Sequence, residues 1–509
     1  MRTTLAPILV RLGGPAGRPP RPAQILDLKV CDPAMGSGAF LVEACRQLGD
    51  ALVAAWHAHG EVPAIPPDER EDIFAMRLVA QRCLYGVDRN PVAVDLAKVS
   101  LWLATLARDH ALTFVDHALR HGDSLVGLSR KQIEAFHWDP VAPRFQAGFE
   151  TMRVREHMAK VAELRRRIRE ADESVSDWEL RDLWDKAQFE LGKVRLFGDL
   201  VLAAFFEGEK PKEREGKRAE YASAVVSGEA DRYHEWLEEW RNGEQPLAPF
   251  HWEIEFPEVF ARENPGFDAI AGNPPFLGGT QISEQYGMSY FQWLTMSFHE
   301  CRHHCDLVAY FFRRSFTNLR DAGCLGFIAT NTISQGDTRE GGLRVLINEG
   351  GEIYHATRRL KWPGLAAVVV SVLHLSKNHR VQNKLLDGLP VPEISAYLVN
   401  GSVSESPARL SSNPYFSLGS KIYGQGFLFA DDDPDCTSVV ERERLLAAHP
   451  DWKGRIPPYI GGEEINSDPL HRPRRFVISL SDVSDEGDLN RWPELKSIVE
   501  QRVKPERLR

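Results

Sequence analysis

The stretch Asn273-Pro274-Pro275-Phe276 places polar and aromatic groups directly after the apolar run "FDAIAG". Two prolines restrict the backbone there and carry no N–H donors of their own. The Asn273 side-chain oxygen and the Pro274 carbonyl then form a fixed pair of acceptors, which suits an amino group with two hydrogens. Phe276 offers a flat face on which a planar base could stack. A proline-capped turn without chemistry is the alternative.

A second stretch, "DPAMGSGAFL" at 32–41, stands between a strand-like and a helix-like run. Two of its glycines lack a Cβ, so a ligand could approach the backbone, and the following helix N-terminus offers free N–H groups. A dinucleotide fingerprint would need a third glycine where Leu41 stands, so a nicotinamide cofactor is disfavoured. A turn that simply needs glycine is the other interpretation. We expect five residues here at a ligand site: Asp32, Pro33, Ala34, Gly36 and Gly38.

Two further acids end strand-like runs. Asp88 in "YGVDRN" could accept hydrogen bonds from both hydroxyls of a ribose. Asp123 in "HGDSL" follows a short third strand and could face the edge of a purine. Each acid read alone could be a solvated strand end or a turn residue. Four such features in order, each at a strand end, favour a ligand site.

The elements that must position these residues alternate between strand and helix. Strand patterns occur at 25–32, 82–90, 266–273 and 324–332, and two more lie in 350–377. Helical patterns begin at Ala39 and Pro91, and another runs from Asp306 until Gly323. Such alternation predicts an α/β fold with a doubly wound, parallel, Rossmann-like sheet and ligands at the carboxyl ends of its strands.

Four regions follow from changes in composition. Residues 1–149 and 246–377 would form the two parts of the sheet domain. Residues 150–245 are highly charged and helix-patterned, which predicts an inserted hairpin or arm with an exposed loop at 210–220. Residues 378–509 are rich in turns and short strands, which predicts a second domain.

The stretches "DPAMGSGAFL", "GVDRN", "GDSL" and "NPPF" together resemble the ordered motifs of the gamma class of S-adenosylmethionine-dependent DNA adenine-N6 methyltransferases. The resemblance covers roughly residues 26–377 and is strongest to the methylase part of type IIG-like restriction–modification and phage-defence proteins. It implies a methyltransferase sheet, S-adenosylmethionine as cofactor, double-stranded DNA as partner and no metal. Other subunits of such a system are possible partners.

The resemblance also implies roles for the site residues. The loop with Asp32, Gly36 and Gly38 would lie beneath the methionine part of the cofactor, Asp88 would bind the ribose hydroxyls, and Asp123 would accept from the adenine amino group. Asn273 and Pro274 would hold the target N6, and Phe276 would stack on the flipped base.

Two departures from the family pattern concern the ends. The family carries an aromatic-Thr-Pro segment upstream, which "MRTTLAPIL" does not provide. We therefore expect either a truncated start or a segment supplied by another polypeptide. The end resembles only part of a target-recognition domain, which is our interpretation of 378–509.

Composition bounds the setting. With 43% hydrophobic and 26% charged residues the chain is typical of a soluble globular protein, and its net charge of −10 argues weakly against nucleic-acid binding. Seven scattered cysteines indicate reduced thiols in the cytoplasm. The most apolar run, Ala366–Leu375, is too short to span a bilayer, so no membrane association is expected.

Other candidates are weaker. "CRHHC" at 301–305 lacks a second ligand pair for zinc and is interpreted as ordinary helix. "ELRRRIRE" at 163–170 is a solvated helix or a DNA-backbone contact, and "SQGDTREGG" at 334–342 is a plain loop or a contact to DNA or base. Asp306 is interpreted as structural. No set of two carboxylates and a lysine predicts a nuclease.

Two other functions stay open at this point. A methyltransferase for an RNA base or a protein glutamine amide would use the same Asn-Pro-Pro logic. A DNA-binding subunit without activity of its own is the third possibility.

Overall fold

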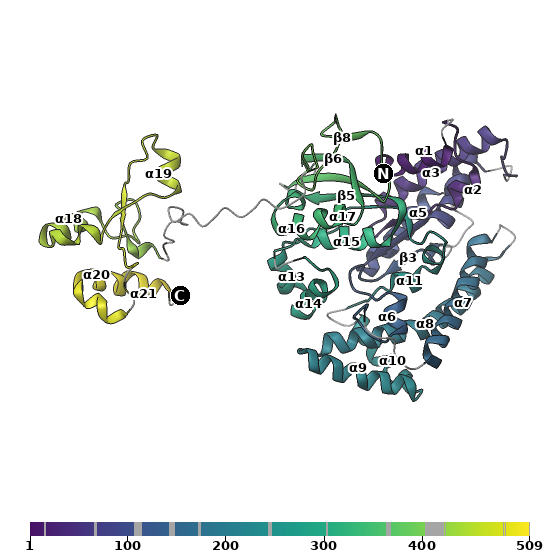
Figure 1. The fold of residues 1–509 in the computed structure, drawn as a ribbon, viewed down its shortest axis with the longest axis horizontal. Coiled ribbons are helices and arrows are strands. Elements are labelled where there is room, and N and C mark those ends of the chain that lie inside the picture. Colours follow the sequence, from purple (N-terminus) through teal and green to yellow (C-terminus); the bar gives the residue numbers. More distant parts are fainter. Residues whose placement is uncertain are drawn as a thin grey trace. The chain divides into compact units, whose positions relative to one another are not determined.

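A computed structural model describes residues 1–14, 17–65, 69–105, 115–141, 148–171, 175–242, 247–301, 304–362, 368–402, 422, 424–481, 483 and 485–507. The chain divides into two compact units, Met1–Ser406 and Pro407–Arg509 (Figure 1). The first unit contains every residue that the sequence predicts at the ligand site.

The first unit is built on a nine-stranded sheet with the order β3-β2-β1-β4-β5-β7-β6-β8-β9. The strands are β1 (Val30–Asp32), β2 (Leu84–Asp88), β3 (Leu119–His121), β4 (Phe267–Gly272), β5 (Leu319–Thr330), β6 (Gly351–Lys361), β7 (Val369–Lys377), β8 (Lys384–Leu386) and β9 (Leu389–Val391). Neighbours from β3 to β5 are parallel, which confirms the predicted α/β, doubly wound architecture. Strand β7 runs antiparallel to both β5 and β6. It follows β6 with no helix between them among the described residues, and consecutive strands without a crossover pair in this way.

Helices of the predicted kind pack on this sheet. In α3 (Ala39–His59) the side chains of Ala44, Leu48 and Leu52 recur every four residues and are buried, whereas Phe40, one turn before Ala44, is only half-buried. Helix α5 (Pro91–Ala104) begins with proline, whose missing N–H costs nothing in the first turn.

Two predicted boundaries are wrong. The first strand is confined to Val30–Asp32, because residues 22–26 form the short helix α2 (Pro22–Leu26) with proline in its first turn. Helix α15 (Leu307–Asn318) ends before Gly323, and β5 begins at Leu319. The glycine instead lies inside the strand, where an added Cβ would meet the Arg320 and Phe267 carbonyls.

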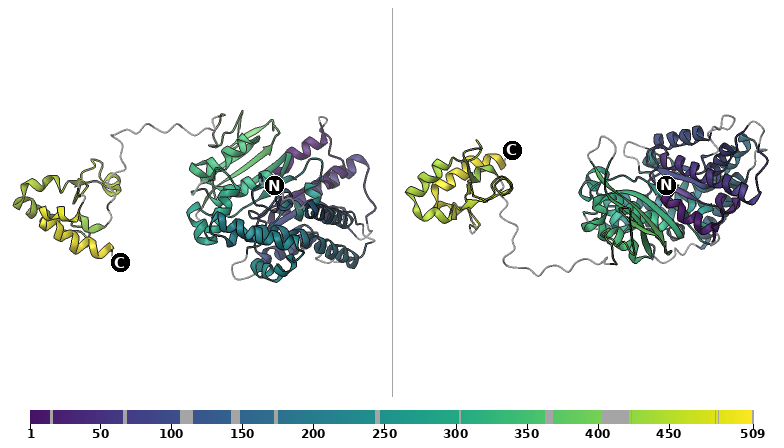
Figure 2. Two further views of the ribbon diagram at one scale, coloured as in Figure 1. Left: turned by 60° about the horizontal axis from the view of Figure 1, so that its bottom comes forward. Right: turned by 90° about the horizontal axis from the view of Figure 1, so that it is seen from above.

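The charged insertion consists of α7 (Gly148–Glu170), α8 (Asp177–Glu207), α9 (Pro211–Val226) and α10 (His234–Asn242), and its long helices lie side by side (Figure 2). Ser176 and Glu179 form a reciprocal capping box at the start of α8. The exposed loop predicted at 210–220 is wrong, because Pro211 opens α9 and Glu213 accepts from the Lys210 N–H at 3.3 Å.

The insertion shares its core with the sheet domain. Arg165 of α7 and Glu258 of α12 (Pro257–Phe260) form an ion pair of 2.6 Å between side chains that are 1% and 6% exposed. Asp199 of α8 pairs with Arg241 at 2.6 Å and lies 3.2 Å from the buried His251. A hairpin is present as predicted, but it is packed against the sheet domain along its length.

The boundary between the units falls later than the one expected at 378. Strand β8 pairs with β6, and β9 pairs with β8, so both extend the sheet of the first unit. The second unit has a three-stranded antiparallel sheet of order β10-β12-β11, formed by β10 (Leu428–Phe429), β11 (Pro458–Tyr459) and β12 (Arg475–Val477). It has a core of its own, made by Phe429, Leu445, Trp452, Ile456, Ile478 and Leu495.

Candidate functional site

A cavity of about 300 Å³ lies where the carboxyl ends of β1, β2, β3 and β4 meet. Six of the predicted site residues line it: Pro33, Ala34, Asp88, Asp123, Asn273 and Pro275. The remaining five predicted residues, Asp32, Gly36, Gly38, Pro274 and Phe276, are close in sequence to these but do not form its lining. The structure thus brings the cofactor and target-base candidates to one cavity.

The loop after β1 is held by hydrogen bonds that its backbone N–H groups donate. The Gly36 N–H donates to Asp88 Oδ2 at 2.9 Å, and the Gly38 N–H donates to the Met35 carbonyl at 2.8 Å. Both glycines have positive φ, +53° and +82°. A Cβ on Gly38 would lie 3.1 Å from the Ala97 Cβ. The missing side chain of Gly38 therefore lets α3 pack against α5, which differs from the expected approach of a ligand.

Asp32 is a buried acid at the base of this loop. Its Oδ1 accepts from the Ala34 N–H at 3.0 Å, and no hydrogen bond reaches Oδ2 from the described residues. The pKa of Asp32 is raised to about 8. Burial is the main cause, the hydrogen bond from the Ala34 N–H acts against it, and the Asp88 charge adds to the rise. Asp32 is thus largely protonated at neutral pH.

Asp88 connects the two turns beside the cavity. Its Oδ2 accepts from Gly36, and its Oδ1 accepts from the Asn90 N–H at 2.8 Å. Asn90 in turn caps α5 by accepting from the Val92 N–H at 3.0 Å. Because each carboxylate oxygen has two acceptor positions, Asp88 keeps capacity for two further donors.

Asn273 follows β4 directly and presents an open acceptor. Its Oδ1 is buried and receives no hydrogen bond from the described residues. A buried acceptor without a donor is unfavourable, so such an atom in a cavity marks a place for a ligand donor. Pro275 is exposed at the cavity, whereas Phe276 is half-buried and packs against the core.

The Asn-Pro-Pro-Phe segment is held in place by the start of α15. Asp306 Oδ1 accepts from the Leu277 N–H at 3.3 Å and from the Val308 N–H at 3.0 Å. The Leu307 N–H donates to the Leu277 carbonyl at 2.8 Å. Asp306 does not line the cavity, so the structural role expected for it agrees with its position.

Sequence reasoning missed several cavity residues, namely Arg89, Gly122, Ser124, Tyr286, Tyr290, Leu307 and Phe311. Tyr290 donates to Asp123 Oδ2 at 3.0 Å, and the Arg89 guanidinium lies 4.6 Å from the centre of the Tyr286 ring. Arg89, Gly122 and Ser124 had a signal, because each is next to a predicted acid, Asp88 or Asp123. The tyrosines come from α13 (Gly279–Tyr286) and α14 (Met288–Ser297), which follow the Asn-Pro-Pro-Phe segment without a recognisable motif.

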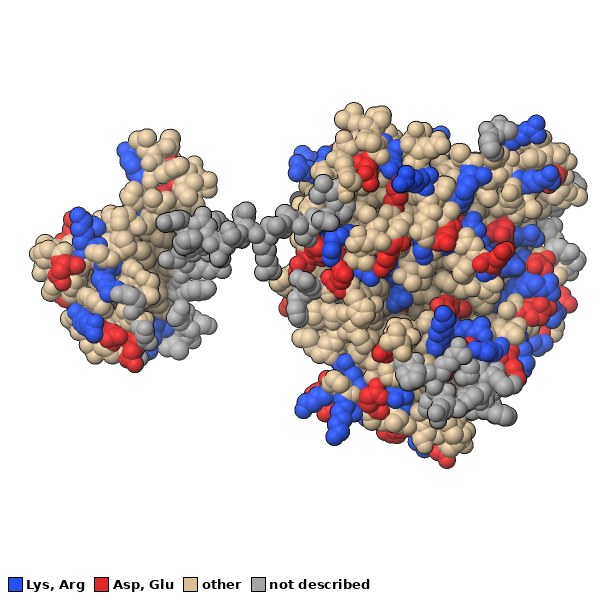
Figure 3. Space-filling model, viewed as in Figure 1, with Lys and Arg blue, Asp and Glu red and all other residues tan. Residues whose placement is uncertain are grey.

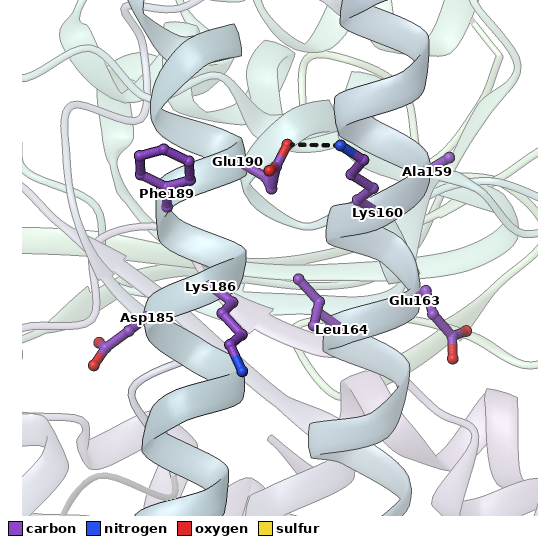
Figure 4. Close-up of a pocket in the computed structure, with 8 residues that line it drawn as sticks. All are labelled: Ala159, Lys160, Glu163, Leu164, Asp185, Lys186, Phe189 and Glu190. Carbon is purple, nitrogen blue, oxygen red and sulfur yellow. Dashed lines mark ion pairs between the residues drawn. The ribbon is translucent and has the colours of Figure 1, made fainter.

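A larger cavity, of about 760 Å³, lies between α7 and α8 (Figure 4). Leu164 and Phe189 contribute apolar surface, and Lys160 and Glu190 form an ion pair of 3.7 Å across it. None of the predicted site residues lines this cavity.

The weaker candidates have structural surroundings. Arg166 is exposed and pairs with Glu163 and Glu170 at 2.7 and 2.6 Å, as expected for a solvated helix, whereas Arg165 of the same run is buried and pairs with Glu258. Figure 3 shows basic and acidic side chains interspersed over the visible face of the first unit. The loop predicted at 334–342 is wrong in part, because residues 336–341 form α16 (Gly336–Gly341), with Thr338 and Arg339 buried.

The segment around "CRHHC" is not the ordinary helix that we expected. Cys301 and Cys305 are buried between α14 and α15, and the arrangement of Arg302 and His303 lies outside the described residues. In the described part of the chain no group of three or more His, Cys, Asp or Glu side chains could hold a metal ion. No described helix has the length and apolar character that a membrane crossing requires.

Among the solved structures that resemble this chain are two restriction-modification proteins of low sequence identity. The Type IIL restriction-modification enzyme MmeI, solved in complex with DNA, is 16% identical with a TM-score of 0.44, over 94% of this chain and 48% of that chain. The EcoKI M protein of a Type I restriction enzyme is 12% identical with a TM-score of 0.30, over 74% of this chain and 43% of that chain.

Sequence comparison gives a relative in Methanocaldococcus jannaschii, named "Putative type II restriction enzyme and methyltransferase RM.MjaORFECS2P". It is 26% identical over 337 residues, which are 61% of this chain and 26% of that protein. The chain therefore spans about a quarter of that relative and about half of the MmeI chain.

Two family models match the chain. The MmeI DNA-methyltransferase domain matches residues 22–129, and the Eco57I restriction-modification methylase matches residues 82–350, more than half of the 509 residues. These matches confirm the resemblance to restriction–modification DNA methyltransferases on which the predicted site rests. The chain belongs to the Eco57I restriction-modification methylase family.

Proposed function

We propose that this chain transfers a methyl group from S-adenosylmethionine to N6 of an adenine in double-stranded DNA, as part of a restriction–modification or phage-defence system. The observation that carries the proposal is Asn273 Oδ1, a buried acceptor without a donor in the same cavity as Asp88 and Asp123. Membership of the Eco57I family supports DNA as the substrate.

The acceptors at the cavity fit the cofactor. Asp88 retains acceptor positions for the two ribose hydroxyls, and Asp123 lines the cavity where an adenine amino group could donate. Leu307 and Phe311 add apolar surface suited to a purine ring. S-adenosylmethionine, when bound, supplies a methyl group that its positively charged sulfur has already activated.

The chain's task is then to position and polarise the target amine. An adenine amino group is a poor nucleophile because its lone pair is delocalised into the ring. Asn273 Oδ1 and the Pro274 carbonyl would accept hydrogen bonds from its two hydrogens and return the lone pair to the nitrogen. The rigid prolines fix the direction of these acceptors, which favours in-line attack. Neither acceptor is basic enough to keep the proton that leaves after transfer, so it passes to water.

The target base must leave the duplex to reach Asn273, at a cost of a few kcal/mol in lost stacking. A cavity of about 300 Å³ is at the lower limit for a small-molecule site, so a cofactor and a flipped base together require it to widen.

We assign the second unit to target recognition. We also place the protein in the cytoplasm, which the seven free, buried cysteines support.

Separate substitutions at the two halves of the cavity test this proposal. Asn273→Ala should abolish methylation of DNA while the cofactor Kd, measured by calorimetry, stays within about threefold of the parent value, less than ~1 kcal/mol. Asp88→Ala should instead raise the Kd at least about tenfold, because the ribose hydroxyls lose their carboxylate acceptor. Asp95→Ala removes an exposed acid of α5 outside the cavity and serves as the matched control.

Thermal unfolding of each variant separates binding from folding, because Asp88 also accepts from Gly36 and Asn90. An Asp88→Ala protein that is folded and binds the cofactor as the parent does would contradict the ribose role. Equal loss of cofactor binding and methylation in Asn273→Ala would contradict the target-base role. Methyl transfer to RNA or to a protein glutamine instead of DNA would replace the proposed substrate.

A further inference from the structure

The Asp123 carboxylate is held by two donors, one of which, Tyr290, also lines the cavity. Its Oδ1 accepts from the Leu125 N–H at 2.9 Å, and its Oδ2 accepts from the Tyr290 hydroxyl at 3.0 Å. The side chain of Asp123 is only 4% exposed, yet the residue lines the cavity. Without these donors such a buried carboxylate could turn, and its oxygens would lack hydrogen bonds.

These two contacts leave part of the carboxylate available. A carboxylate has about four acceptor positions on its two oxygens. The Leu125 N–H occupies one on Oδ1, and the Tyr290 hydroxyl, 3.0 Å from Oδ2 and 3.3 Å from Oδ1, occupies one more. Arg89 Nε lies 3.8 Å from Oδ2, too far for a hydrogen bond. Asp123 is thus an acceptor with spare capacity at the cavity.

Helix α14 holds the Tyr290 hydroxyl against this carboxylate. Tyr290 and Trp293 are three residues apart and so lie on one face of the helix. Trp293 Nε1 donates to the Leu125 carbonyl at 3.1 Å, which fixes the helix to the segment that carries Asp123. Burial of Tyr290 and the nearby Asp123 charge raise the pKa of the phenol well above its usual value, so the hydroxyl remains a donor.

We infer that Tyr290 is a positioning residue that makes Asp123 selective for a cofactor with an exocyclic amino group. This inference rests on the proposed function. The Tyr290 hydroxyl donates to the carboxylate and fixes its direction, so that the remaining acceptor positions are available to the purine edge. A purine with a 6-amino group satisfies them, whereas a purine without it leaves a buried acceptor poorly paired.

The test compares two ligands on the full chain. S-adenosylhomocysteine carries the 6-amino group, and its analogue with hydrogen at that position does not. Calorimetry on the parent and on Tyr290→Phe, which keeps the ring and removes only the hydroxyl, gives the preference for the amino ligand. We expect this preference to fall roughly tenfold in Tyr290→Phe, the effect of one hydrogen bond to a charged group, while the Kd of the analogue stays nearly unchanged.

Tyr286→Phe is the matched control. Tyr286 lines the same cavity with its ring 5.0 Å from that of Tyr290, but in the described part of the chain its hydroxyl makes no hydrogen bond to Asp123. This variant should keep the parent preference. Thermal unfolding of both variants confirms that they fold.

Each other result overturns the inference. An equal loss of affinity for both ligands in Tyr290→Phe would show a structural role only. A gain for the amino ligand would show that the hydroxyl competes with it for Asp123, and an unchanged preference would show that Tyr290 does not act through Asp123. If the folded parent binds neither ligand, the proposed function itself fails.

Discussion

Folding raises the pKa of the Asp32 carboxyl far above its ordinary value. Its folded-state pKa of about 8 exceeds the ordinary value of 3.8, so folding takes up a proton between these values. The stabilisation from this proton is complete below about pH 4 and is lost as the pH rises through about 8.

Asp32→Asn should remove this dependence. The amide is neutral at every pH, and its oxygen can still accept from the Ala34 N–H. In urea denaturation the free energy of unfolding of the variant, relative to that of the parent, should rise by roughly 1–3 kcal/mol between pH 6 and pH 9. A constant difference across this range would show that Asp32 is ionised in the folded protein.

The sequence predicted one part of the candidate site and not the other. Asn273 and Asp88 could be found because each directly follows an apolar run, and a strand end fixes where its next residue lies. Tyr290 could not, because it lies on a helix without a motif and meets Asp123 only across 167 residues of sequence. Gly38 was predicted because a missing Cβ would let a ligand approach the backbone, but in the structure the missing Cβ makes room for Ala97.

At the scale of elements, the buried Arg165–Glu258 ion pair is one of the contacts that join the insertion to the sheet domain. Burial disfavours the charge on Glu258, but Arg165 more than offsets this, and the pKa of Glu258 lies below its ordinary value. Arg165 also lies 5.3 Å from the centre of the Trp184 ring on α8. Removal of Arg165 alone would leave a buried, unpaired carboxylate.

Arg165→Met should therefore lower the free energy of unfolding by about 3–5 kcal/mol, measured by urea denaturation. Arg165→Met with Glu258→Met should recover most of the loss, since no buried charge remains. Arg166→Ala, which removes a neighbouring exposed arginine, is the control and should change stability much less. Similar effects of Arg165→Met and Arg166→Ala would contradict the account of how the insertion is held.

The sequence predicted elements best where their ends carry chemical signals. The helix starts predicted at Ala39, after the glycines of the 32–38 loop, and at Pro91 coincide with the first residues of α3 and α5. The change from α15 to β5 at Asn318–Leu319 has neither glycine nor proline, so the helical pattern seemed to continue to Gly323. Helix α9 was missed because its polar, charged residues are typical of loops as well as of exposed helices.

For the whole molecule, the two compact units have separate cores, and every residue of the candidate cavity belongs to the first. A fragment of residues Met1–Ser406 should therefore fold and bind S-adenosylmethionine with a Kd within about threefold of the full chain, which calorimetry measures. The fragment should lose discrimination between DNA sequences, because we assign target recognition to the second unit. A fragment that keeps full sequence discrimination would contradict that assignment.

Periodicity and strand order explain why the fold class was predictable while its details were not. From β1 to β5 the sequence shows strands alternating with helices, and this alternation predicts the parallel pairing that the structure has. The antiparallel direction of β7 and the pairing of β8 and β9 at the end of the sheet depend on which neighbouring strand each of them pairs with. That choice is made by tertiary packing, so the domain boundary was expected too early.

The central claim concerns which atom receives the methyl group. The full chain is incubated with double-stranded DNA and S-adenosylmethionine labelled in its methyl group, and the DNA is then digested to nucleosides that are identified by mass. The account predicts label in N6-methyladenine with the parent chain and none with Asn273→Ala. Label in another nucleoside, or equal labelling by Asn273→Ala, would contradict it.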